Sequence, residues 1–161
     1  MIDIDVREAL QNEGVSANFA YEGFPEMDVS FVKPLVLNAE YCATNRKVSV
    51  KGTFEAVLST VCDRCLADMQ TTIYEKFDEI FVFGGEGVQD DEVYTYTGGS
   101  VSLDKMVHDA IYLSLPQQLL CKDDCKGLCP QCGQNLNDKK CECKQENTDD
   151  MNPFTKLKGL F

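Results

Sequence analysis

The clearest pattern of hydrophobic and polar positions lies between residues 35 and 83. Residues 35–43 alternate apolar and polar side chains, and residues 47–61 are rich in β-branched and aromatic side chains with the same period of two. This alternation is typical of strands with one buried face. Residues 44–46 favour a turn, so we expect two antiparallel strands joined by a hairpin. Residues 69–83 predict another long strand.

The flanking segments carry weaker patterns. Residues 2–10 alternate at first and then become helix-like, which predicts a short strand or the start of a helix. Residues 11–33 are interrupted by glycine and proline, so they predict irregular chain or an edge strand. Residues 84–99 are glycine-rich and acidic, and they predict a surface loop around a short strand at residues 93–96.

One helix is predicted near residues 103–115. Ser102 is suited to cap its N-terminus, and Pro116 is suited to end it. Apolar residues recur on one face with helical spacing, at Leu103, Met106, Val107, Ala110 and Ile111. An amphipathic helix that follows a run of strands predicts that the helix docks on the sheet.

The length and composition suit a folded protein. The 161 residues are enough for one domain with a small appendage, and 43% of them are hydrophobic, which argues against disorder throughout. The N-terminus is acidic and polar, unlike a signal peptide, and no stretch reaches the roughly 20 apolar residues of a membrane span. We therefore expect a cytoplasmic protein without membrane contact, in a compartment where thiols stay reduced.

The net charge of −12 is distributed unevenly. Residues 1–120 hold 8 Lys and Arg against 20 Asp and Glu, a net charge of −12, whereas residues 121–161 hold 7 of each sign. An acidic body repels a phosphate backbone and suits a basic protein partner. The neutral C-terminal part is still free to approach nucleic acid.

Cysteine is the residue type that carries chemistry in this chain. Six of the nine cysteines lie within residues 121–143, and the string CPQCG at 129–133 resembles a zinc knuckle in which the glycine takes a positive φ. Cys42 lies in a predicted strand and is expected to be a small core residue. The other eight match two structural Zn²⁺ sites with four cysteine ligands each: Cys62, Cys65, Cys121, Cys125, Cys129, Cys132, Cys141 and Cys143.

The spacing leaves two pairings of these cysteines open. In the first, the pair at 129–132 joins the pair at 141–143 around one ion, and the pair at 121–125 joins the pair at 62–65 between the two long strands. That arrangement ties the sheet to the C-terminal segment. In the second, the pair at 62–65 joins the pair at 129–132.

Together these features predict an α+β fold with three parts. Residues 1–120 are expected to form an acidic β-rich body: an antiparallel β-sheet, or a partly open barrel-like body, with one main helix packed on it. Residues 121–145 are expected to form a Cys-rich zinc-binding module. Residues 146–161 form a C-terminal tail suited to a short docked helix, with Pro153 in its first turn.

Catalytic signatures are few, and we expect no enzyme activity and no small-molecule substrate. His108 is the only histidine, and it lies off the apolar face of the predicted helix. Clustered thiolates also permit a redox sensor that loses zinc on oxidation. A further alternative is direct RNA binding by lysines around the module, for which charge balance is the simpler explanation. These candidate phosphate contacts are Lys122, Lys126, Lys139, Lys140 and Lys144.

Several strings in the chain resemble the YceD family, the large-ribosomal-RNA-subunit accumulation proteins. They are CDRCL at 62–66, LSLP at 113–116, CKDDCKGLCPQCGQNLN at 121–137 and the closing C-x-C. The string GLCPxCGxxLN is the specific part, and the N-terminal third matches only in general character. The resemblance implies a bacterial or organellar factor needed for normal accumulation of the large-subunit rRNA.

The charge distribution, the cysteine module and this resemblance lead to one functional hypothesis. We expect a non-enzymatic factor in ribosome biogenesis whose acidic body engages a basic ribosomal protein or a large-subunit precursor particle. The zinc-stiffened module is expected to present the contact. A direct RNA-binding zinc module and a zinc–thiolate redox sensor are the alternatives.

Overall fold

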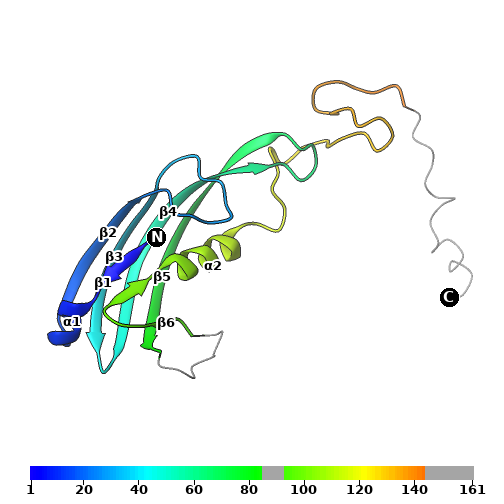
Figure 1. The fold of residues 1–161 in the computed structure, drawn as a ribbon. Coiled ribbons are helices and arrows are strands. Elements are labelled where there is room, and N and C mark those ends of the chain that lie inside the picture. The colour runs from blue at the N-terminus through cyan, green and yellow to red at the C-terminus, as the bar shows by residue number, and fades with distance from the viewer. Residues whose placement is uncertain (85–92, 144–161) are drawn as a thin grey trace, which may run out of the picture.

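The computed structural model describes residues 1–84 and 93–143. An open five-stranded sheet in the order β2-β3-β4-β5-β6 curves around one helix (Figure 1). Its strands are β2 (Ser16–Gly23), β3 (Leu35–Thr44), β4 (Lys47–Val61), β5 (Asp68–Phe83) and β6 (Thr95–Tyr96). The first four are antiparallel neighbours, and β6 runs parallel to β5. The two end strands of the described sheet do not pair, so the sheet is not closed into a barrel.

The remaining elements lie over one face of this sheet (Figure 1). Strand β1 (Asp3–Asp5) pairs antiparallel with β7 (Ser100–Ser102). Helix α1 (Arg7–Gln11) follows β1, and helix α2 (Asp104–Ser114) follows β7. The N-terminal ten residues therefore contain both the strand and the helix start that their pattern left as alternatives. No helix within the described residues has the length and apolar character needed to cross a membrane.

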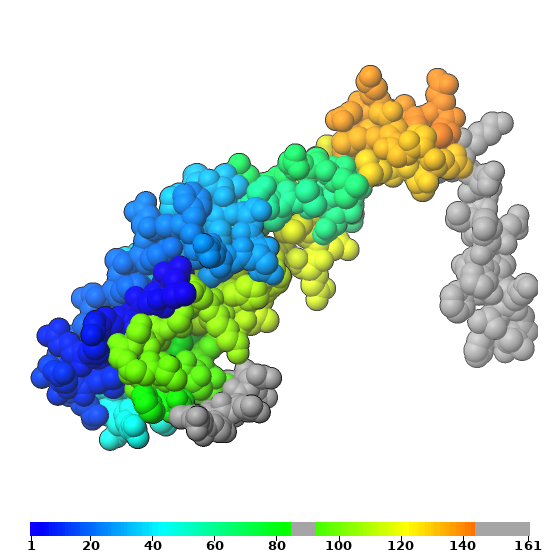
Figure 2. Space-filling model, viewed as in Figure 1, coloured from blue at the N-terminus to red at the C-terminus, as the bar shows by residue number. Residues whose placement is uncertain are grey.

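The β4–β5 hairpin positions the site described below. The two strands pair from Lys47 and Val82 to Val61 and Asp68. Strand β3 accompanies β4 only as far as Glu55, so the far end of the hairpin projects beyond the sheet as a ribbon (Figure 1). The C-terminal module lies beyond the tip of this ribbon, as a lobe apart from the body (Figure 2). The hairpin is thus the element that joins sheet and module.

The core lies between the inward face of the sheet and the segments that cover it. Strands β3, β4 and β5 contribute alternate residues to this face, including the fully buried Leu37, Phe54 and Phe81. Cys42 was expected in this core, and that prediction is wrong. It pairs with Ser49 on the opposite face and is only partly buried, because the alternation of β3 turns Ala43 inward instead.

Helix α2 buries the apolar face that its spacing predicts, with Met106, Val107 and Ile111 in the core. The prediction that Ser102 caps it is wrong. Ser102 belongs to β7, where it pairs with Asp3, and the N-cap residue is Leu103, which has no side-chain cap. The first turn is held instead by the Asp104 carboxylate, which accepts the backbone N–H of Ile2 at 2.9 Å.

Candidate metal centres

Eight of the nine cysteines form two groups that can each hold a metal ion. We call the first the clasp site, formed by Cys62, Cys65, Cys121 and Cys125. We call the second the distal site, formed by Cys129, Cys132, Cys141 and Cys143. Within each group the four sulfurs lie within 4.8 Å of one another, and none of the cysteines forms a disulfide. The structure thus groups the cysteines as in the first of the two pairings that the spacing left open.

The clasp site begins at a tight turn at the tip of the β4–β5 hairpin. The backbone N–H of Leu66 donates to the Cys62 carbonyl at 2.9 Å, and the N–H of Cys62 donates to the Ala67 carbonyl at 2.9 Å. Leu66 takes a left-handed φ of 58°, which is costly for a residue with a Cβ. The turn brings the thiols of Cys62 and Cys65 to the same side without ending either strand ladder early.

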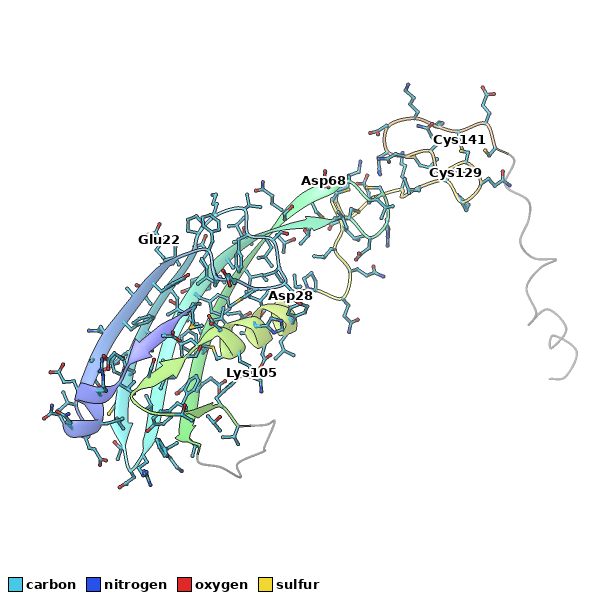
Figure 3. All side chains as sticks on the ribbon, in the orientation of Figure 1. Glu22, Asp28, Asp68, Lys105, Cys129 and Cys141 are labelled. Atoms are coloured by element: carbon cyan, nitrogen blue, oxygen red, sulfur yellow. The ribbon has the colours of Figure 1, made fainter. Side chains whose placement is uncertain are left out.

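The distal site is built on the same kind of turn, but here a glycine takes the position with positive φ. Gly133 donates its N–H to the Cys129 carbonyl at 2.9 Å, and Cys129 donates to the Gln134 carbonyl at 2.8 Å. Gly133 takes a φ of 71°, which confirms the positive φ expected for it. The two turns therefore repeat one hydrogen-bond pattern. Figure 3 shows Cys129 and Cys141 next to each other in the module.

The spacing of the sulfurs in the clasp site fits one tetrahedral ion. The sulfurs of Cys62 and Cys125 are 3.8 Å apart, and those of Cys65 and Cys121 are 3.6 Å apart. Four sulfurs placed tetrahedrally at about 2.3 Å from an ion are about 3.8 Å from one another. Three of the four cysteines are buried, and Met69, Leu120 and Leu128 are among the apolar residues around them. This surrounding shields the three buried sulfurs from water and oxidants.

The two middle residues of the first C-x-x-C fasten the later chain to the hairpin. Asp63 accepts the N–H of Leu119 at 2.6 Å through its carboxylate and donates its own N–H to the Leu119 carbonyl at 2.8 Å. The Arg64 guanidinium donates to the Cys125 carbonyl at 3.2 Å, and the Arg64 carbonyl accepts the N–H of Leu128 at 3.0 Å. No role was predicted for Asp63 or Arg64 from the sequence. Their charged side chains between two candidate metal-ligand cysteines are the sequence feature that could have indicated such a role.

Asn137 connects the two sites. It lies in the loop between the two cysteine pairs of the distal site, and its side-chain N–H donates to the Cys125 sulfur of the clasp site at 3.4 Å. Its side-chain oxygen accepts the backbone N–H of Lys126 at 2.9 Å, and Asn135 accepts a second N–H from its amide at 2.9 Å. The orientation of one clasp ligand therefore depends on how the distal loop is folded.

We expect Asn137→Ala to weaken metal binding at the clasp site by about tenfold, because ligand-orienting hydrogen bonds contribute tenfold to a hundredfold in affinity. Competition with a graded series of chelators measures the loss of the two ions separately. Asp138→Ala is the control, since Asp138 is the exposed next residue of the same loop. Equal retention of both ions in the two variants contradicts the assigned role of Asn137.

The thiols of each site differ in acidity. The pKa of Cys62 is lowered to about 6, chiefly by a hydrogen bond from the backbone of Cys121. Hydrogen bonds from the backbone of Cys132 and Gln131 lower the pKa of Cys129 to about 6. Desolvation of its sulfur raises the pKa of Cys121 to about 12 although the residue as a whole is exposed, and the hydrogen bond with Cys132 raises the pKa of Cys143 to about 12. Each site therefore offers a thiolate to attract a cation and thiols that release protons when the ion binds.

The lysines predicted as phosphate contacts surround the module. All four that the structure describes are exposed: Lys122, Lys126, Lys139 and Lys140. Lys144 and the tail at residues 146–161 lie outside the described residues. The described module, residues 121–143, holds four acidic residues as well as these four lysines, so its side chains other than cysteine are neutral as a group.

His108 serves to connect elements of the body. Its two ring nitrogens lie 3.0 Å from an Asp28 carboxylate oxygen and 3.4 Å from an Asp109 carboxylate oxygen. Tyr112 donates its hydroxyl to the same Asp28 at 2.9 Å. These contacts fasten α2 to the loop between β2 and β3. That loop reaches α2 over a separation of 80 residues.

Comparisons with known proteins place this geometry in context. A model of the protein family described as "Large ribosomal RNA subunit accumulation protein YceD" matches residues 50–161. An uncharacterised protein of Mycobacterium tuberculosis is 34% identical over 93 residues, which are 55% of this chain and 45% of that protein. The Arabidopsis thaliana protein named large ribosomal RNA subunit accumulation protein YCED homolog 1, chloroplastic, is 23% identical over 146 residues, 72% of this chain and 46% of that protein. The uncharacterised Bacillus subtilis protein YlbN is 24% identical over 110 residues, 67% of this chain and 64% of that protein.

The matched family segment contains every cysteine of both sites. The aligned region spans just under half the length of the mycobacterial and Arabidopsis relatives. No solved structure gives a significant match to the chain. The similarity therefore rests on sequence, and the geometry of the sites rests on the structure described above.

Proposed function

This chain belongs to the YceD family, whose model matches residues 50–161, and from that premise we propose that it is a non-enzymatic factor in ribosome biogenesis. The family is described as large ribosomal RNA subunit accumulation protein, and the Arabidopsis relative carries the same description. The proposed role is to support accumulation of the large-subunit rRNA. The proposed partner is a basic ribosomal protein or a large-subunit precursor particle.

The negative charge of the body favours a basic partner. Residues 1–84 and 93–120 hold 16 Asp and Glu against 8 Lys and Arg. Only two of those carboxylates form ion pairs with Lys or Arg in the described chain, Asp5 with Arg7 and Asp78 with Lys51. Most of the acidic side chains are thus left to interact with a partner. Like charge opposes contact with free rRNA, whereas a basic ribosomal protein is attracted over about one Debye length.

The proposed metal at both sites is Zn²⁺. All donors are cysteine sulfurs, each site has four of them, and those of the clasp site have the spacing of a single tetrahedral ion. Four protein ligands leave no open position for a substrate, which is typical of structural zinc. An iron–sulfur cluster puts several irons and sulfides among its cysteines and requires a wider separation of ligands. Bound zinc is proposed to hold the module at a fixed position on the acidic body.

Gradient sedimentation of cell lysate at low salt tests the proposed function. We expect the tagged full-length chain to comigrate with large-subunit precursors or to retain a basic ribosomal protein, identified by mass spectrometry. Both associations are expected to weaken as salt is raised, because charge attraction is screened. A chain that is absent from precursor fractions and retains no ribosomal protein contradicts the proposal.

The exposed lysines of the module favour direct RNA contact as the second candidate function. Direct RNA binding predicts that the logarithm of affinity falls with the logarithm of salt by roughly one unit per phosphate contact. Lys139→Glu combined with Lys140→Glu would then abolish binding to purified rRNA fragments. Unchanged association with precursors in that double variant assigns the contact to the acidic body instead.

A further inference from the structure

The sheet has two edges of very different character. One edge is β6, which has two residues. The other is β2, which has eight residues and pairs with β3 along its whole length, from Ser16 with Cys42 to Gly23 with Leu35. Within the described chain no strand pairs with the other side of β2, and it runs along the outer border of the sheet (Figure 1). Alternate residues of such an edge direct N–H and C=O groups away from the sheet.

The β2 edge lacks several of the features by which exposed edges usually avoid pairing. Its sequence SANFAYEG contains neither proline nor lysine, and its one-to-one register with β3 leaves no bulge. The outward side chains Ser16, Asn18 and Ala20 are small. The inward Phe19 and Tyr21 pack against the core but are only partly buried. Another strand at this edge would cover both rings and complete the core at this side.

Charge determines which strand can be added. Residues 8–32, which contain β2 and both of its flanks, have no Lys or Arg and carry five acidic residues, Glu8, Glu13, Glu22, Glu26 and Asp28. Figure 3 shows Glu22 at the border of the sheet, pointing away from it. Glu40 of the neighbouring strand is also exposed. Pairing with the same edge of a second copy would bring two sets of five carboxylates together, so a cationic segment is the favoured occupant.

We propose that the β2 edge is a docking site for an extended cationic segment of a partner protein, which pairs with β2 as an additional strand. Main-chain hydrogen bonds supply the affinity, and the partly buried Phe19 and Tyr21 select apolar side chains at alternate positions of the segment. The acidic flanks select Lys or Arg at the positions between them. The identification of the partner as a basic ribosomal protein rests on the function proposed above. The open edge and its charge are observed independently of that function.

The test uses the full-length protein and an eight-residue peptide of alternating Lys and Val. We expect binding to slow amide hydrogen exchange of β2 residues by at least tenfold. The same peptide with every peptide nitrogen methylated keeps the charge but lacks all main-chain donors, and we expect it to leave exchange at β2 unchanged. Equal binding of both peptides, or protection elsewhere in the protein, overturns the proposal.

Two matched substitutions separate the edge from the overall charge. Ala20→Lys adds a cation to the edge strand and is expected to weaken peptide binding at least tenfold. Thr53→Lys adds the same charge in the same cross-strand row, since Asn38 pairs with both residues, but in the central strand β4, and binding is expected to change less than threefold. Equal losses of peptide affinity in the two variants mean that the interaction depends on charge alone, and they overturn the proposal.

The remaining outcomes identify other occupants or separate the two proposals. A dimer of the free protein with protected β2 amides assigns the edge to a second copy, and protection by an RNA oligonucleotide assigns it to nucleic acid; both contradict a cationic strand. A chain that associates with large-subunit precursors but does not bind the peptide rejects the edge site alone. Peptide binding at β2 without any association with ribosomal components rejects the proposed function alone.

Discussion

Cys62→Ser is expected to remove one of the two proposed zinc ions per chain and to release residues 119–128 from the hairpin. Cys62 is fully buried and its sulfur lies 3.8 Å from that of Cys125, so a hydroxyl there leaves three thiols without a fourth soft ligand. Structural zinc binds with about 10–16 kcal/mol in small domains, so the loss of one ligand outweighs the hydrogen bonds of Asp63 and Arg64. Native mass spectrometry reports the metal count, and amide exchange of residues 119–128 reports the release.

Two control variants distinguish this effect from a general effect of losing a thiol. Cys42→Ser changes the one cysteine that belongs to neither site, so two ions and normal exchange are expected. Cys132→Ser removes a ligand of the distal site, so one ion is expected while the hairpin stays attached to residues 119–128. A wild-type chain without metal, or loss of both ions in both metal-site variants, contradicts two separate sites.

Gly52→Ala is expected to destabilise the protein by about 2–3 kcal/mol, although it adds a single methyl group. A Cβ on Gly52 would overlap the backbone oxygen of Asn38 and lie 2.9 Å from the ring of Phe77. The first of these is backbone of the neighbouring strand, which cannot move without disturbing the ladder. Phe77 covers the position that the missing side chain leaves open. Thermal unfolding measures the loss, which corresponds to roughly 4–12 °C for a chain of this size.

Ser49→Ala in the same strand is the control for this prediction. Ser49 lies on the opposite face of β4, paired with Cys42 and Ile80, and surface substitutions of this kind change stability by about 0.5 kcal/mol or less. If Gly52→Ala unfolds at the same temperature as Ser49→Ala, the close approach of β3 to β4 at Gly52 is not present in solution.

The strands of the sheet could be predicted because the alternation of apolar and polar residues is a local feature of the sequence. Residues 35–43 and 47–61 alternate clearly, and Asn45 and Arg46 take the positive φ values of a tight hairpin turn, 51° and 59°. The third strand and the helix followed from the same kind of pattern. Where the local signal was absent, as for β7, no element was predicted. Where two signals competed, as at Ser102, strand pairing with Asp3 took precedence over capping.

The metal sites also have some features that depend on local sequence and others that depend on long-range folding. The sequence alone determined that eight cysteines make two sets of four, and that Gly133 permits the turn of the distal site, because ligand count and turn chemistry depend on neighbouring residues. That the pair at 62–65 meets the pair at 121–125 follows from the long-range folding of the chain. That choice depends on the path of some 55 intervening residues, including how far the β4–β5 hairpin projects beyond the sheet. The same long-range path places Asn137 against Cys125 and leaves β2 at an open edge, which no spacing along the chain can specify.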